Sequence, residues 1–148
     1  MKPSDEIRNP SLFSIQLVAG CIITMIFVYV AAGWGLIATG VIPKEGLGDL
    51  SPSAYTTLSL VFVAIGLPII GASFPIKRAL QTKISARNGT GPSNASAIAV
   101  AIAICEAPAL FGFTLAMLGG ITPYCWVLWS LSFAASILHF PLRMPERP

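Results

Sequence analysis

The stretch ASAIAVAIAICEAPALFGFTLAML, residues 95–118, contains one charged side chain, Glu106, in an otherwise almost wholly apolar run. An α-helix of about 20 apolar residues is long enough to cross the hydrocarbon core of a membrane. Lipid offers the backbone no hydrogen-bond partners, so a spanning stretch of this kind is expected to be helical. The stretch therefore predicts a membrane-spanning helix with a single carboxyl group about midway along it.

The rest of the composition also indicates a membrane protein. The chain has 148 residues, of which 55% are hydrophobic and 10% charged, and its mean hydropathy is +0.78. Ordinary soluble domains carry about 25% charged residues. Three further apolar stretches cover residues 12–39, 55–76 and 122–140. We therefore expect one all-α integral membrane domain over residues 1–148, with four transmembrane helices.

The first apolar stretch is predicted to be a retained helix. It is much longer than the apolar core of a typical signal peptide, and Asp5 and Glu6 precede it.

The basic residues predict the orientation of the four helices. Lysine and arginine are enriched in cytoplasmic segments. With four spans, Lys44 lies alone on one side, and all the other basic residues share the opposite side: Lys2, Arg8, Lys77, Arg78, Lys83, Arg87, Arg143 and Arg147. We therefore expect both termini to be cytoplasmic and the protein to lie in the bacterial inner (cytoplasmic) membrane. We read the net charge of +3 as a topology signal, and we expect no nucleic-acid partner.

Small residues predict where the helices pack closely. Small side chains at four-residue spacing let helices approach each other in lipid. One such row within 95–118 is Ala95, Ala99, Ala103 and Ala107, and a second row beside it is Ala97, Ala101, Cys105 and Ala109. Gly66 and Gly71 occupy the stretch 55–76. We expect the second and third spans to form the closest pair. The three cysteines are expected to be small buried hydrophobic residues, with no disulfide and no metal site.

Glu106 is the principal candidate site residue. An ionised carboxylate at the centre of a membrane helix costs about 2.5–3.5 kcal/mol on insertion scales. We therefore expect Glu106 to be neutral unless water or a cation reaches it. Two roles remain open: a protonated carboxyl that bonds a neighbouring helix, and a reversible proton or cation site. Pro108 has no N–H, so it frees the carbonyl of Ile104 as an acceptor for a protonated Glu106.

The pattern of Glu106-Ala107, three residues, and Phe111-Gly112, in a span that follows a basic polar loop, resembles the proteolipid c subunit of rotary (F/V-type) ATP synthases. The resemblance covers the second span, the loop and the third span only. It implies a hairpin whose mid-membrane carboxylate carries a proton or sodium ion in an oligomeric ring. Phe111 stands where the family has a tyrosine, so the hydroxyl that commonly helps to hold the carboxylate is expected to be missing. Extra spans flank the hairpin, and the loop lacks the family's signature.

The ion expected at Glu106 is the proton. A dehydrated hard cation needs several oxygen ligands, and the facing stretch VAIGLPII, residues 63–70, has no side-chain oxygen. We expect no catalytic residues, no cofactor and no enzyme activity. The expected partners are membrane lipid and further membrane subunits. The alternative function is that of a small structural subunit of a larger respiratory or photosynthetic membrane complex.

Other polar residues in the spans are expected to have minor roles. His139 is expected to lie at the membrane interface, although a pigment or haem ligand stays open. Gln16 is expected to be an end-of-helix polar group. Hydroxyl groups are expected to bond carbonyls of their own helices at Thr114, Ser130, Ser132 and Ser136.

Overall fold

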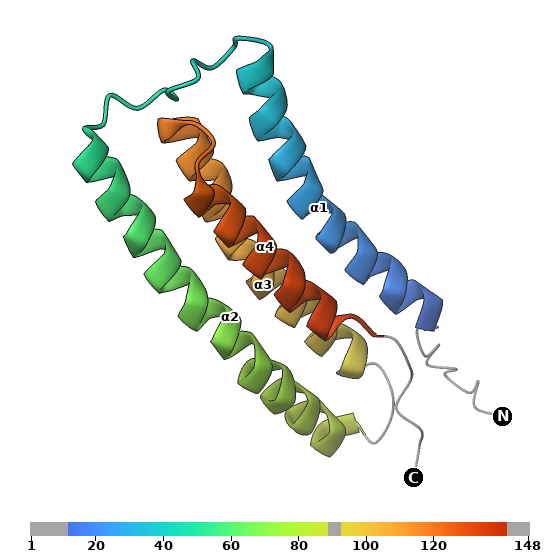
Figure 1. Ribbon diagram of the computed structural model, residues 1–148. Helices are drawn as coiled ribbons and strands as arrows, with labels where there is room; N and C mark the ends of the chain where they lie inside the picture. The colour runs from blue at the N-terminus through green and yellow to red at the C-terminus, as the bar shows by residue number, and fades with distance from the viewer. Residues whose placement is uncertain (1–11, 89–92, 142–148) are drawn as a thin grey trace, which may run out of the picture.

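Four helices make up the described part of the chain. The computed structural model describes residues 12–88 and 93–141. The helices are α1 (Leu12–Ala38), α2 (Pro52–Asn88), α3 (Ser93–Gly119) and α4 (Pro123–His139), and successive helices run in opposite directions (Figure 1). The expected all-α fold is confirmed.

Three of the helices are long and apolar enough to cross a membrane, over Ile15–Ala38, Pro52–Lys83 and Ser96–Gly119. These helices indicate a membrane protein. Helix α4 has 17 residues, which is the lower limit for a span, so a fourth span stays a prediction. The orientation also stays a prediction, since four of the basic residues behind it lie outside the described residues: Lys2, Arg8, Arg143 and Arg147.

Helix α2 is longer than the predicted span. It continues past Ile76 to Asn88 without a break. Pro68 and Pro75 lie inside the helix and do not end it. Membrane helices tolerate proline when neighbouring groups or local adjustments satisfy the freed carbonyls.

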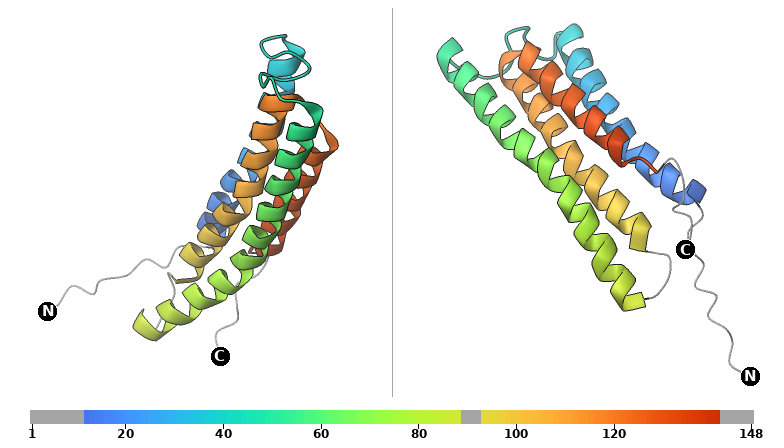
Figure 2. Two further views of the ribbon diagram at one scale, coloured as in Figure 1. Left: turned by 90° about the vertical axis from the view of Figure 1, so that its left-hand side faces the viewer. Right: turned by 60° about the horizontal axis from the view of Figure 1, so that its bottom comes forward.

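Helix α3 contacts each of the other three helices, whereas α1 and α2 do not contact each other within the described residues. Helix α4 packs on α3 as extensively as α2 does. The predicted close pairing of α2 and α3 is therefore confirmed, but the α3–α4 pair equals it, because α4 returns along α3 after a short turn and shares its buried face. Figures 1 and 2 show α1 and α2 on either side of α3 and α4.

The second row of small residues on α3 forms its contact face. Every member of this row is fully buried: Ala97, Ala101, Cys105 and Ala109. The first row does not form a continuous contact face, because Ala103 is exposed and Ala99 and Ala107 are half-buried. The side chain of Ala95 lies outside those that the structure describes.

The two glycines of α2 differ in the same way. Gly66 is buried, and a Cβ placed on it would lie 3.4 Å from Pro108 of α3. Gly71 is exposed, and a Cβ placed on it would have no neighbour within 4 Å. Of these two glycines, only Gly66 is therefore a point of close contact with another described helix.

The loop between α1 and α2 closes the end of the bundle around the α3–α4 turn. The N–H groups of Leu47 and Gly48 donate to the carbonyls of Met117 and Leu118, at 2.7 and 2.9 Å. The hydroxyl of Tyr55 lies 3.0 Å from Oγ1 of Thr122 and donates to the carbonyl of Leu115 at 3.3 Å. These bonds satisfy carbonyls that the C-terminus of α3 leaves without helical partners.

We expect Gly112→Ala to destabilise the fold. An added Cβ would lie 2.9 Å from Nε1 of Trp129, whose N–H donates to the carbonyl of Ala109 at 3.1 Å. Overpacking of this kind typically costs about 1–3 kcal/mol. The matched control is Gly71→Ala, which adds the same methyl group in open space and should leave stability unchanged. Unfolding midpoints in detergent test the pair, and equal midpoints for the two variants would contradict the assigned α3–α4 contact.

Candidate functional site: the Glu106–Tyr29 pair

Glu106 is bonded to a tyrosine of another helix. The hydroxyl of Tyr29, in α1, donates to Oε1 of Glu106 at 2.7 Å. Both side chains are half-buried within the chain. The bond therefore joins α1 to α3 through the one carboxyl group in α3.

Sequence reasoning missed Tyr29. Phe111 has no hydroxyl, as noted, and its ring stacks on Phe62 of α2 at a centroid distance of 4.9 Å. The hydroxyl that bonds the carboxyl comes instead from Tyr29 of α1. The available signal was its position: Tyr29 lies inside an apolar span rather than at its end, and a buried tyrosine hydroxyl usually has a hydrogen-bond partner.

The support that Pro108 and Ile104 would give to Glu106 stays a prediction. No hydrogen bond joins Glu106 to the carbonyl of Ile104 in the described part of the chain. Pro108 is buried against Gly66 and thus contributes to the contact between α2 and α3. The carboxyl of Glu106 is bonded on the α1 side of the helix instead.

Apolar side chains close the α1–α3 interface on both sides of the pair. Toward the start of α3, Ile98 and Ile102 pack on Ala19 of α1. Toward its end, Leu115 and Ala116 belong to the main buried cluster, together with Ile26 and Trp129.

The opposite side of Glu106 borders an exposed strip of α3. Ala103, Leu110 and Thr114 are exposed and lie at helical spacing on one face. Glu106 lies at the edge of this face, next to α1. The half-buried carboxyl therefore borders the outer surface of the bundle.

A second polar cluster joins α2 to the end of α4. His139 is 1% exposed, so the protein itself covers its ring, and its expected position at the membrane interface stays a prediction. Its Nε2 lies 2.8 Å from Oγ of Ser73, and its ring lies 4.4 Å from that of Phe74. Lys77, one turn further along α2, donates from Nζ to the carbonyl of His139 at 3.5 Å.

The direction of the Ser73–His139 bond follows from the other bond of Ser73. The hydroxyl of Ser73 donates to the carbonyl of Ile70 at 2.6 Å. Because a hydroxyl has one proton to donate, Oγ of Ser73 accepts from His139, and Nε2 of His139 carries a proton. That nitrogen is therefore engaged within the protein, and the arrangement makes His139 a link between α2 and α4.

The remaining polar candidates behave differently from one another. Thr114 bonds the carbonyl of Leu110 in its own helix, as expected. Ser132 instead donates across to the carbonyl of Cys105 in α3. The hydroxyl of Ser136 is buried and has no hydrogen-bond partner among the described residues. Gln16 donates from Nε2 to the carbonyl of Pro141 at 3.0 Å, which holds the start of α1 to the residues after α4.

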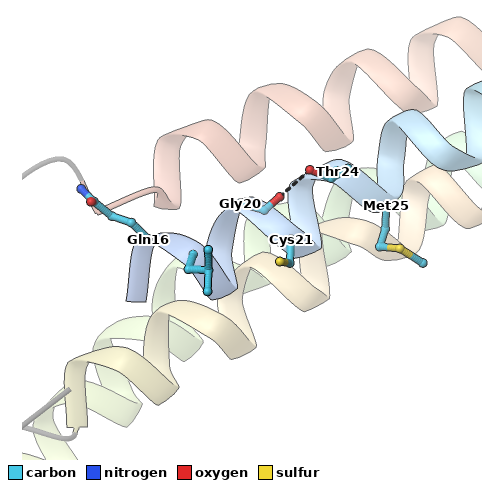
Figure 3. Close-up of a pocket in the computed structure, with 6 residues that line it drawn as sticks. Gln16, Gly20, Cys21, Thr24 and Met25 are labelled. Carbon is cyan, nitrogen blue, oxygen red and sulfur yellow. Dashed lines mark hydrogen bonds between the residues drawn. The ribbon is translucent and has the colours of Figure 1, made fainter. Parts of the chain in front are cut away.

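A hollow of about 610 Å³ lies along α1 and is lined by residues of that helix alone (Figure 3). Its lining is formed by Gln16, Leu17, Gly20, Cys21, Thr24 and Met25. Thr24 bonds the carbonyl of Gly20 within the helix. The hollow holds no ionisable group besides the free thiol of Cys21, so it adds no acid–base chemistry to that of the Glu106–Tyr29 pair.

All three cysteines are free, and the described residues contain no group of three histidine, cysteine or acidic side chains that could hold a metal ion. No protein-family model, curated protein or solved structure matches the chain. The resemblance to the proteolipid c subunit therefore stays a prediction.

We expect Tyr29→Phe to lower stability by about 1–3 kcal/mol, because it leaves an oxygen of Glu106 without its donor. The matched control is Tyr124→Phe, which removes a hydroxyl that forms no described hydrogen bond. A double-mutant cycle with Glu106→Leu, which removes the acceptor, measured by unfolding in detergent, should give a coupling above about 0.5 kcal/mol. Additive effects of the two substitutions would show that the bond does not contribute.

Two serines one turn apart provide a matched pair for the buried polar groups of α4. Ser132 and Ser136 are both fully buried, but only Ser132 has a partner in the described part of the chain. We expect Ser132→Ala to lower the stability of the fold by about 1 kcal/mol. Ser136→Ala should leave the stability unchanged or raise it. Unfolding midpoints in detergent measure both. A larger loss for Ser136→Ala would contradict the assigned bonding.

Proposed function

We propose that the chain is a proton-carrying, proteolipid-like membrane subunit in which Glu106 takes up and releases the proton. The observation that carries the proposal is the 2.7 Å bond from Tyr29 to Glu106 at the edge of an exposed strip of α3. A carboxyl inside a membrane helix is costly and is commonly functional. Here one neutral donor holds it, and no described ion pair neutralises it.

The proposal includes a topology and a location. Four transmembrane helices, with both termini on the cytoplasmic side of a bacterial inner membrane, agree with the distribution of the basic residues. The antiparallel course of α4 along α3 supports its assignment as the fourth span, although it is the shortest of the helices.

The geometry of the site favours a proton over a sodium ion. Among the described residues, the side chain hydrogen-bonded to Glu106 is Tyr29. One hydroxyl and one carboxyl supply fewer oxygens than a dehydrated hard cation requires. A proton needs only the carboxyl itself.

Labelling with dicyclohexylcarbodiimide tests the site, since the reagent requires a protonated carboxyl in an apolar setting. We expect Glu106 to react, to react faster at low pH, and to be insensitive to sodium at neutral pH. Glu106→Gln is the negative control, because the described membrane helices hold no other carboxyl group. Protection by sodium would reverse the choice of ion, and a lack of reaction at every pH would reduce Glu106 to a structural hydrogen-bond acceptor.

A second candidate function is that of a structural subunit of a larger respiratory or photosynthetic membrane complex. The observation that favours it is the uncovered strip of α3: α1 and α2 do not meet across it, and small side chains such as Ala103 remain exposed. Small residues suit close contact with a further helix in lipid.

Purification in native lipid separates the two candidates. We expect the proton-carrying subunit to be recovered as a homo-oligomer. Recovery as a single copy among larger, cofactor-bearing subunits would favour the structural role.

A further inference from the structure

Helix α2 projects beyond the bundle. Its 37 residues give a length of about 55 Å at 1.5 Å per residue, whereas the hydrocarbon core of a membrane is about 30 Å thick. Helix α4 ends at His139, beside Ser73 and Lys77 of α2. The turns of α2 from Arg78 to Asn88 therefore reach past the end of α4, as both Figure 1 and Figure 2 show.

This projecting end of α2 is strongly basic. Between Lys77 and Asn88 the helix carries four basic residues and no acidic one: Lys77, Arg78, Lys83 and Arg87. Arg78 and Lys83 are exposed.

No carboxylate of the described chain neutralises these charges. The acidic residues of the described ranges are Glu45 and Asp49, in the loop at the opposite end of the bundle, and Glu106 within α3. No ion pair is formed among the described residues. The negative charges that balance this basic end must therefore come from outside the described residues.

Apolar residues on the same segment suit it to a position at the membrane surface. Ile76 and Leu80 lie four residues apart and thus share one side of the helix. Ile76 is 37% exposed within the chain. Lysine and arginine stems can lie along apolar surface while their charged groups reach the polar headgroup layer.

We propose that the basic end of α2, at Lys77, Arg78 and Lys83, is a binding surface for the headgroups of anionic phospholipids. Basic clusters next to a membrane helix are attracted to anionic lipid, and the attraction falls off within a Debye length of the surface. A lipid headgroup fits better than a soluble acidic protein, because the segment continues a membrane helix and carries apolar residues on one side. The proposal does not depend on the role of Glu106.

Electron paramagnetic resonance of the intact chain in phosphatidylcholine vesicles tests this surface. Spin-labelled phosphatidylglycerol and spin-labelled phosphatidylcholine are the probes. We expect the protein to immobilise phosphatidylglycerol preferentially, and Arg78→Gln or Lys83→Gln each to weaken that preference about fivefold, the equivalent of about 1 kcal/mol per charge. The control is Lys44→Gln, which removes an exposed lysine at the opposite end of the bundle and should leave the preference unchanged.

Three results would overturn the proposal. The first is equal immobilisation of the two lipids by the unaltered chain, which would leave an acidic protein as the complement. The second is an equal effect of Lys44→Gln and Lys83→Gln, which would indicate that the preference for phosphatidylglycerol depends only on the net charge of the protein. The third is displacement of the lipid by inorganic phosphate but not by chloride of the same ionic strength, which would indicate a site for free phosphate.

Discussion

The close approach of helices to α3 is the constraint on which the rest of the structure depends. In lipid, helices gain little from burying apolar surface against one another, so packing and hydrogen bonds must hold them together. The fully buried small side chains of α3, such as Ala101 and Cys105, bring neighbouring backbones near. Gly112 extends this contact, since an added Cβ would touch Trp129 of α4. Helix α3 can therefore contact three neighbours at once.

Hydrogen bonds between helices are distributed around α3 and its partners. Tyr29 bonds Glu106 between α1 and α3, Ser132 bonds the carbonyl of Cys105 between α4 and α3, and Ser73 bonds His139 between α2 and α4. An unpaired polar group in an apolar medium is costly. Each of these bonds therefore satisfies groups that would otherwise destabilise the helices, and each also fixes which helices are neighbours. Ser136 is the exception, since its buried hydroxyl has no partner within the described ranges.

The position of Glu106 combines two requirements of a proton-exchanging site. A carboxyl must be held in one place, and it must also be reachable. The bond from Tyr29 meets the first requirement, and the exposed strip beside Glu106 meets the second. Since α1 supplies the hydroxyl, the proposed site needs three helices: α3 for the acid, α1 for its donor, and α2 to border the strip from the other side. A hairpin of α2 and α3 alone would lack the donor.

The sequence by itself determined the kind of protein, the number and approximate ends of the helices, and Glu106 as the notable polar residue. These features depend on local properties. The length of an apolar stretch decides where a helix can cross a membrane. A single carboxyl group in such a stretch stands out because the residues next to it in the sequence are apolar. The sequence also singled out both small-residue rows of α3 but could not decide which of them is buried. Only the tertiary structure decided that α4 shares the buried face of α3, that Ala103 and Gly71 face outward, that His139 is buried against Ser73, and that Tyr29 bonds Glu106. The reason is physical: these contacts join residues far apart in the chain, such as Tyr29 and Glu106, and helical spacing specifies only which residues share a face, not which helix that face meets.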